Sequence, residues 1–155
     1  MSICVLGGGS FGTTLAGLMA AQGVAVTLWL RDEKVAAEIA ASHENKRYMP
    51  DFKIDPRPQV STDMHAAVAA ADMVFLAIPS SAFRTMLREI GAGLAGKDVV
   101  STTKGIEQPG FLMMSEIAEQ EAPHARVAVL SGPNLAKEIA AGELTATVVA
   151  SADQA

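Results

Sequence analysis

The sequence predicts an α/β fold, a doubly wound and mostly parallel sheet with helices on both faces. Short runs of β-branched residues alternate with Ala-rich stretches of helical periodicity along the 155 residues. Some runs, such as 73–78, are apolar at almost every position. This pattern is typical of parallel strands that are covered on both sides. A chain of this length buries one core, so we expect one domain over residues 1–155.

The first half of the chain is expected to form strand 3–6, helix 11–22, strand 25–30 and helix 34–42. Gly23 directly follows the first helix, as is typical of a helix C-terminus. Residues 42–58 contain three prolines and charged and aromatic residues. We expect this segment to be irregular, to run over the surface and to flank a ligand cleft.

The second half repeats the alternation, beginning with a strand near Val60. Ser61, Thr62 or Asp63 can cap the helix that follows, and Gly142 follows the last helix. The remaining expected strands are 73–78, 98–101, 127–130 and 145–150, and the expected helices are 64–71, 82–93, 113–121 and 135–141.

Composition excludes several classes of partner. The net charge is −5 and the Lys and Arg residues are scattered, so no basic stripe is available for nucleic acid. No segment approaches the roughly 20 apolar residues that span a membrane. The N-terminus lacks the features of a signal peptide, so a cytoplasmic location is expected. Cys4, the single cysteine, is expected to be buried in a strand and chemically inert.

The most informative motif is the loop between the first strand and the first helix. Gly7, Gly9 and Gly12 form the pattern G-x-G-x-x-G. In this context the first glycine allows a tight turn, the second lets a pyrophosphate approach the backbone, and the third lets helix and strand pack closely. The helix N-terminus adds a partial positive charge. The loop therefore predicts a Rossmann-type, dinucleotide-binding domain.

Two other motifs share these residues. Gly7 and Gly12 have the spacing of a phosphate-binding P-loop, but Thr13 stands where that motif needs lysine. The run 8–12 also matches the G-x-S-x-G elbow of α/β-hydrolases. Only one strand precedes it, so no earlier strand–helix loop is available for the oxyanion hole. Both alternatives are disfavoured.

The end of the second strand indicates which dinucleotide binds. Folds specific for NAD place an acid there, which accepts hydrogen bonds from the ribose 2′-hydroxyl. Leu30 occupies that point and Arg31 follows, and a guanidinium suits a 2′-phosphate. NADP(H) is therefore favoured over NAD(H). Two alternatives stay open: Asp32 supplies an NAD-type acid if the strand is shifted, or Arg31 is an ordinary surface charge.

Polar stretches follow three of the other expected strands, where ligands lie in open α/β sheets. They are Ile-Pro-Ser at 78–80, Thr-Lys-Gly-Ile-Glu at 103–107, and Ser-Gly-Pro-Asn-Leu-Ala-Lys-Glu at 131–138. With the glycine loop and Trp29, the chain resembles the NAD(P)-dependent glycerol-3-phosphate dehydrogenases over nearly its whole length. Residues 45–50 also resemble that family's N-x-R-Y-L-P segment. Two positions depart from the family pattern. Many bacterial members have Ser or Thr at the position of Asn134, and Phe is frequent at the position of Leu135.

The resemblance implies reduction of dihydroxyacetone phosphate to sn-glycerol 3-phosphate with NAD(P)H, for phospholipid precursor synthesis. It implies that Lys104 contacts both cofactor and substrate. From the residues alone, Lys104 offers three donors and a charge to a phosphate or a carbonyl. Besides Gly7, Gly9 and Gly12, the implied cofactor residues are Ser10, Phe11, Arg31, Tyr48 and Ala136, and the other implied substrate residues are Gly132 and Asn134.

In the family, the proton-donating lysine belongs to a helical C-terminal domain that these 155 residues do not contain. We therefore expect no catalytic acid here, little turnover by the chain alone, and a homodimer formed through exposed apolar surface. His43, His65 and His124 lack metal-ligand spacing, so no metal is expected. Two alternatives remain: a related reductase of the 6-phosphogluconate or ketopantoate type, and a non-catalytic module that senses nucleotides.

Overall fold

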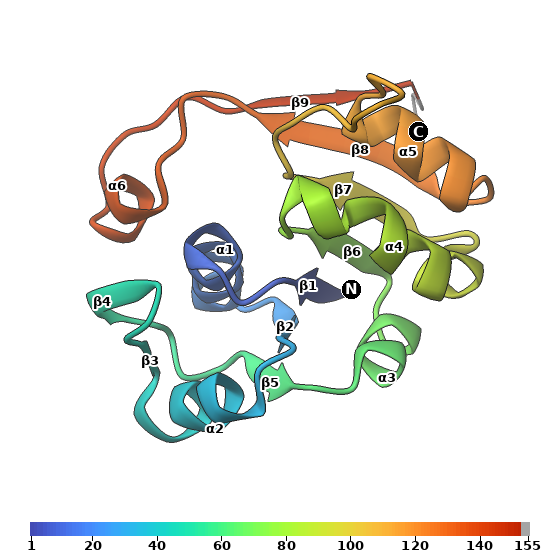
Figure 1. The fold of residues 1–155 in the computed structure, drawn as a ribbon. Helices are drawn as coiled ribbons and strands as arrows, with labels where there is room; N and C mark the ends of the chain where they lie inside the picture. Colours follow the sequence, from blue (N-terminus) through green and yellow to red (C-terminus); the bar gives the residue numbers. More distant parts are fainter. Residues whose placement is uncertain (153–155) are drawn as a thin grey trace.

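The structure, a computed structural model, describes residues 1–152, and a seven-stranded sheet forms its centre (Figure 1). Within this part of the chain six strands run parallel, and β9 pairs antiparallel with β8 at one edge. In sheet order the strands are β5 (Gln59–Ser61), β2 (Ala25–Trp29), β1 (Ser2–Leu6), β6 (Met73–Leu76), β7 (Asp98–Ser101), β8 (Arg126–Ser131) and β9 (Val148–Ser151).

This strand order confirms the doubly wound fold. The chain moves outward from β1 through β2 to β5, then returns to the other side of β1 and moves outward again from β6 to β8. The order therefore reverses between β1 and β6. Connections from these two strands leave in opposite directions, which opens a crevice at their carboxyl ends.

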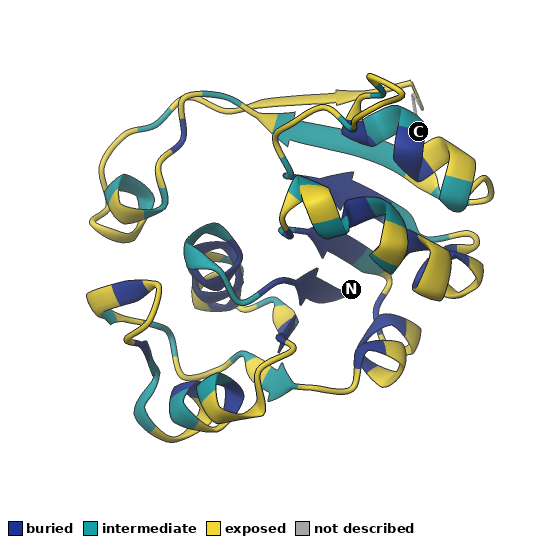
Figure 2. Ribbon diagram, in the orientation of Figure 1, coloured by how far each residue is buried: buried dark blue, intermediate teal, exposed yellow. Residues whose placement is uncertain are grey.

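Helices cover both faces of the sheet, as the apolar strands predict. Ile3 and Val5 pack with α1 and α2, whereas Cys4 and Leu6 pack with α3, α4 and α5, because successive strand residues point to opposite faces. Figure 2 shows buried residues on β1, β6 and β7, and an exposed β9. The helices are α1 (Ser10–Ala21), α2 (Glu33–Ser42), α3 (Met64–Ala69), α4 (Ser80–Ile90), the 3₁₀ helix η1 (Gly91–Leu94), α5 (Met114–Glu121) and α6 (Ala136–Ala140).

The predicted helix ends are also present. Gly23 follows α1 with a φ of +84°, and Gly142 follows α6 with a φ of +78°. Asp63 is the N-cap of α3, and its carboxylate accepts a hydrogen bond from the N–H of Ala66 at 2.9 Å. Glycine suits the left-handed conformation and aspartate suits the cap, so these boundaries follow from local chemistry.

The prediction that residues 42–58 are irregular was wrong for part of the segment. β3 (Glu44–Asn45) and β4 (Met49–Lys53) form an antiparallel hairpin beside α1. The hairpin is held by tertiary burial, since Asn45 is fully buried and Met49 is 2% exposed. The last predicted strand is also displaced, because β9 covers Val148–Ser151 rather than 145–150.

Candidate functional site

Two glycines of the loop are required by the packing of the loop itself. Gly7 has a φ of +126°, and its N–H donates to the carbonyl oxygen of Trp29 at 3.0 Å. A Cβ at Gly7 would lie 2.2 Å from the carbonyl oxygen of Ala77, and one at Gly12 would lie 2.0 Å from the carbonyl oxygen of Gly7. Only glycine fits at either position. The first glycine makes the turn and the third lets α1 pack against it.

Gly9 differs, because a Cβ there would meet nothing within 4 Å. Gly9 is the N-cap of α1, no side chain caps the helix there, and the first turn holds no acidic residue. The N–H groups of that turn therefore face open space at the positive end of the helix dipole. An anion can approach this backbone without meeting a side chain. The loop thus fits the pyrophosphate of a dinucleotide.

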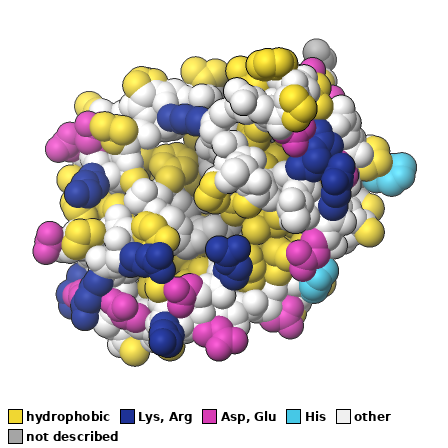
Figure 3. All heavy atoms as spheres, in the orientation of Figure 1, with side chains coloured by type: hydrophobic (Ala, Val, Ile, Leu, Met, Phe, Trp, Pro, Cys, Tyr) yellow, Lys and Arg dark blue, Asp and Glu magenta, His cyan; other side chains and the backbone are white. Residues whose placement is uncertain are grey.

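A cleft of about 320 Å³ lies beside the glycine loop, between α1 and the segments that follow β6, β7 and β8. Figure 3 shows a hollow near the centre of this face, with hydrophobic side chains inside it and Lys and Arg side chains around it. Five residues expected to bind cofactor or substrate line the cleft: Ser10, Phe11, Lys104, Asn134 and Ala136.

Lys104 links two walls of the cleft. Its Nζ donates to the carbonyl oxygen of Gly132 at 2.9 Å and to Oδ1 of Asn134 at 3.0 Å. The Asn134 side chain is held in turn, since it is 5% exposed and its Nδ2 donates to Oγ1 of Thr147 at 3.4 Å. Both acceptors of Lys104 are neutral, and an ammonium has a third donor. The arrangement therefore presents a fixed positive charge to an anionic ligand.

The backbone around Lys104 is anchored to the segment that joins β6 to α4. Oγ1 of Thr103 donates to the carbonyl oxygen of Ile78 at 2.8 Å. Gly105 has a φ of +143°, and a Cβ there would lie 2.9 Å from Cβ of Ser80. Glycine therefore lets the loop pass close to the start of α4. These contacts fix the direction in which Lys104 leaves the backbone.

The end of β2 carries a second group of charges. Arg31 is exposed, as is its neighbour Asp32. Oδ1 of Asp32 accepts from the N–H groups of Lys34 and Val35, at 3.0 and 3.3 Å, and so caps α2. Oδ2 of Asp32 accepts from Nη1 of Arg47 at 3.2 Å. Both carboxylate oxygens of Asp32 are thus engaged within the protein.

The hairpin brings Tyr48 toward the glycine loop. Asn45 makes the connection, because its Nδ2 donates to the carbonyl oxygen of Gly8 at 2.9 Å and to Oγ1 of Thr13 at 2.8 Å. The Arg47 guanidinium lies 5.2 Å from the centroid of the Tyr48 ring, within the range of a cation–π contact. The sequence motif at 45–50 is therefore tied to the glycine loop through Asn45.

The residues singled out in the sequence thus fall into two groups, one on each side of the glycine loop. Lys104 and Asn134 line the cleft and Lys104 also bonds the carbonyl oxygen of Gly132, whereas Arg31 follows β2 and Tyr48 lies in the hairpin. Sequence reasoning missed the anchoring role of Asn45. The signal was present in the motif at 45–50, but the partners of Asn45 lie 32 and 37 residues away.

The family comparison agrees with this geometry. The family described as NAD-dependent glycerol-3-phosphate dehydrogenase N-terminus matches residues 2–155. The chain belongs to this family. Two curated relatives, both named glycerol-3-phosphate dehydrogenase [NAD(P)+], are 53% identical over 152 residues in Ectopseudomonas mendocina and 52% identical over 153 residues in Azotobacter vinelandii. These matches cover 98% and 99% of this chain and 45% of each relative.

Solved structures give the same result. The crystal structure of glycerol-3-phosphate dehydrogenase from Coxiella burnetii superposes with a TM-score of 0.91 and 31% identity, over 98% of this chain and 47% of that chain. The domain therefore has the N-terminal fold of the glycerol-3-phosphate dehydrogenases. The chain spans less than half the length of the relatives it matches.

Three further features concern the single cysteine, metal binding and membrane-spanning helices within residues 1–152. Cys4 is fully buried in β1, as predicted, and burial raises the pKa of its thiol to about 12, so the thiol stays protonated at neutral pH. Residues 1–152 contain no group of three or more His, Cys, Asp or Glu side chains that could hold a metal ion. None of the helices within that range is long and apolar enough to cross a membrane.

Proposed function

We propose that residues 1–155 form the dinucleotide-binding domain of a longer enzyme that reduces dihydroxyacetone phosphate to sn-glycerol 3-phosphate. The contact of Lys104 with Gly132 and Asn134 in the cleft beside the glycine loop carries this proposal. It places a fixed cation and polar groups next to a surface that fits a dinucleotide. A small phosphate ester with a carbonyl group is the substrate class that such a site suits.

The proposed role of the chain is to position the reactants and stabilise charge. A nicotinamide dinucleotide held at the glycine loop would supply the hydride for reduction of the carbonyl carbon. The Lys104 ammonium would attract the phosphate or stabilise the negative charge that develops on the carbonyl oxygen. Phe11 and Leu135 line the cleft and would exclude water from it. The proton that completes the alcohol comes from outside the described residues in this proposal.

The test of the substrate is Lys104→Ala in the full-length protein. We expect kcat/KM for dihydroxyacetone phosphate to fall by about 100-fold, as for the loss of a hydrogen-bonded charge worth roughly 3 kcal/mol. Lys137→Ala is the matched control, because Lys137 is exposed on the neighbouring α6. A wild-type preference for 6-phosphogluconate or ketopantoate would instead indicate one of the related reductases, and absence of turnover with all three would indicate a sensing module.

We also propose a preference for NADP(H) over NAD(H). Arg31 stands free of the Asp32 carboxylate, whose oxygens are engaged by the α2 cap and by Arg47. A carboxylate that already accepts three hydrogen bonds is less available to a ribose 2′-hydroxyl, and an exposed guanidinium suits a 2′-phosphate.

Calorimetric titration of the chain with NADPH and with NADH tests this preference. We expect NADPH to bind about tenfold more tightly than NADH. Arg31→Ala should remove this difference without lowering the affinity for NADH. Arg57→Ala serves as the control, because Arg57 pairs with Asp55. Equal affinities in the wild type would contradict the preference, and failure of both nucleotides to bind would contradict the assignment of the cofactor site.

We further propose that the protein forms a homodimer. Apolar side chains are exposed on and before the edge strand β9, including Leu144, Val148 and Val149. An edge strand with exposed apolar residues favours pairing with another chain.

A further inference from the structure

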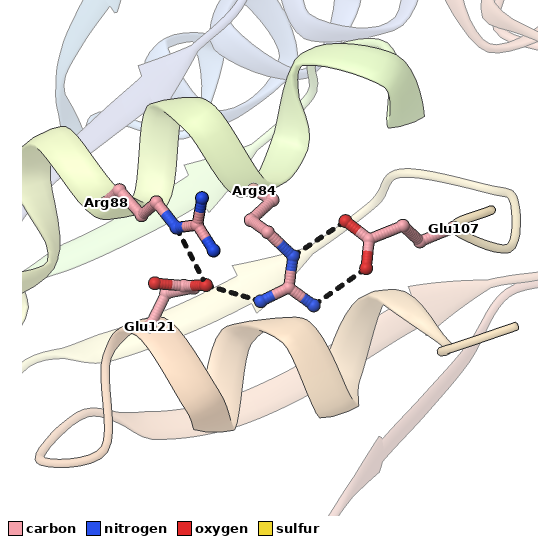
Figure 4. A network of polar contacts seen from close by, with 4 residues as sticks. All are labelled: Arg84, Arg88, Glu107 and Glu121. Atoms are coloured by element: carbon pink, nitrogen blue, oxygen red, sulfur yellow. Dashed lines mark hydrogen bonds and ion pairs between the residues drawn. The ribbon is translucent and has the colours of Figure 1, made fainter. Parts of the chain in front are cut away.

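An ion-pair network joins α4, α5 and the loop that carries Lys104 (Figure 4). Nε and Nη2 of Arg84 donate to the two carboxylate oxygens of Glu107, each at 2.7 Å. Nη1 of Arg84 donates to Oε1 of Glu121, which also accepts from Nε of Arg88 at 3.1 Å. One guanidinium in α4 therefore binds the Lys104 loop through a two-pronged contact and α5 through a third hydrogen bond. We name these four residues the Arg84 network.

Three members of the Arg84 network are largely shielded from water. The side chains of Arg84, Glu107 and Glu121 are 19%, 24% and 15% exposed, whereas Arg88 is 64% exposed. The hydrogen bonds from Arg84 lower the pKa of Glu107 and of Glu121, and the two carboxylates raise the pKa of Arg84. All three groups therefore stay ionised at neutral pH. A bidentate guanidinium–carboxylate pair with this degree of shielding holds its geometry more firmly than an exposed ion pair.

Glu107 is three residues beyond Lys104, so its contact with Arg84 fixes the far end of the same loop. Thr103 anchors the near end on Ile78. Beyond Glu107 the loop turns back on itself, because the N–H of Glu107 donates to the carbonyl oxygen of Leu112 at 2.9 Å. Lys104 thus lies on a short segment that is held at both ends, and its Nζ reaches the far wall of the cleft.

We propose that Arg84 is a positioning residue for Lys104. This inference rests on the proposed function, because it assumes that Lys104 contacts the phosphate-bearing substrate. Without the Arg84 guanidinium, the Glu107 carboxylate loses its partner and faces the second carboxylate of Glu121. The loop then relaxes toward water, and the Lys104 ammonium moves away from Gly132 and Asn134. A displacement of about 1 Å at a binding group is enough to lower a rate substantially.

The experiment is a double-mutant cycle in the full-length protein, with kcat/KM for dihydroxyacetone phosphate as the readout. We expect Arg84→Met to lower kcat/KM about tenfold, within the usual range of coupling between residues that act together. In a Lys104→Ala background the same substitution should have less than about a twofold effect. Arg84→Lys should recover part of the loss, because it keeps the charge and loses the two-pronged contact.

Arg88→Met is the matched control, because Arg88 bonds Glu121 and not Glu107. We expect it to change kcat/KM by less than about twofold. If Arg84→Met does not fold, Glu107→Gln replaces it, since this variant weakens the same contact and leaves Arg84 paired with Glu121.

The outcomes separate the two proposals. Equal losses from Arg84→Met with and without Lys104 would overturn the positioning role and leave the function of Lys104 intact. A normal kcat/KM in Lys104→Ala itself would overturn both. An effect in the wild-type background that disappears without Lys104 would establish the positioning role.

Discussion

Both the nitrogen and the oxygen of the Asn45 side-chain amide form hydrogen bonds, and together they join the β3–β4 hairpin to the glycine loop. Its Nδ2 donates to Gly8 and Thr13, and its Oδ1 accepts from the N–H of Tyr48 at 3.3 Å. Asn45 is fully buried and Thr13 is 1% exposed, so the Thr13 hydroxyl would have no water to replace the lost amide. One residue therefore couples the position of the hairpin to the conformation of the glycine loop.

Replacing Asn45 should affect both stability and binding. We expect Asn45→Ala to lower the free energy of unfolding by about 1–3 kcal/mol, because it leaves buried polar groups unpaired. Asn45→Asp should lower it further, since a carboxylate would face the carbonyl oxygen of Gly8. Urea unfolding followed by the fluorescence of Trp29 measures the change. Lys46→Ala is the control on the same turn, and a wild-type midpoint for Asn45→Ala would contradict the anchoring role.

The pH dependence of stability provides a second prediction from single residues. The pKa values of Glu107 and Glu121 are lowered in the folded protein, so their stabilisation is complete above the ordinary value of 4.5 and is lost as the pH falls through the folded values. Arg84→Met removes the hydrogen bonds that are the main cause of these lowered pKa values. The free energy of unfolding should therefore fall less steeply below about pH 5 in this variant than in the wild type.

Denaturation series across this pH range check the prediction. Arg57→Met gives a useful comparison, because hydrogen bonds from Arg57 lower the pKa of Asp55 from 3.8 to about 2. Its effect should therefore appear at lower pH, between 3.8 and about 2. Identical acid slopes for Arg84→Met and the wild type would show that the Arg84 network adds no pH-dependent stability.

At the scale of elements, the sequence predicted what local chemistry decides. The central strands of the parallel sheet were predicted because both of their faces are apolar. The ends of α1, α3 and α6 were predicted because Gly23, Asp63 and Gly142 suit those positions. The β3–β4 hairpin was not predicted, since it depends on a contact between Asn45 and the distant glycine loop. The Arg84 network was missed for the same reason, because its members lie 23 and 37 residues apart.

The glycine loop and α1 allow binding to be separated from folding. Gly9→Ala should cost less than about 1 kcal/mol of stability, because its Cβ would point into open space. Gly9→Ala should nevertheless weaken NADPH binding by about tenfold or more, since the pyrophosphate would approach through that space. Gly12→Ala should be destabilising by about 1–3 kcal/mol, because its Cβ would overlap the Gly7 carbonyl oxygen.

Thermal unfolding and calorimetric titration of both variants measure these effects. Gly23→Ala is a control for the loss of a glycine outside the loop, although its φ of +84° makes it mildly strained. Unchanged NADPH affinity in a folded Gly9→Ala variant would show that the pyrophosphate does not approach the backbone there.

At the scale of the whole molecule, the sheet is asymmetric in its covering. The central strands are buried on both faces, whereas β8 is only partly covered and every residue of β9 is exposed (Figure 2). The apolar residues there lie on an edge strand whose outer backbone groups are free to pair within the described part of the chain. This edge is therefore where we expect association between copies of the chain.

Val149→Lys tests the expected association. Val149 is 63% exposed in the monomer, so a lysine there costs little in folding but disfavours burial against a second chain. We expect the dissociation constant for self-association to rise about tenfold, the equivalent of roughly 1.4 kcal/mol of lost apolar burial. Sedimentation velocity measures it. Leu18→Lys, on the 48% exposed Leu18 of α1, is the control, and a wild-type chain that is monomeric would refute the proposed dimer.

The sheet order also determines how the candidate site can change over generations. Arg31 follows β2 and Lys104 follows β7, and β1 and β6 lie between those two strands. Three strand spacings amount to about 14 Å. At that distance, the effects of substitutions usually add. If Arg31 selects the coenzyme and Lys104 holds the substrate, as proposed, then a lineage or a protein engineer could change the coenzyme at the β2 end and leave substrate selectivity at the β7 end intact.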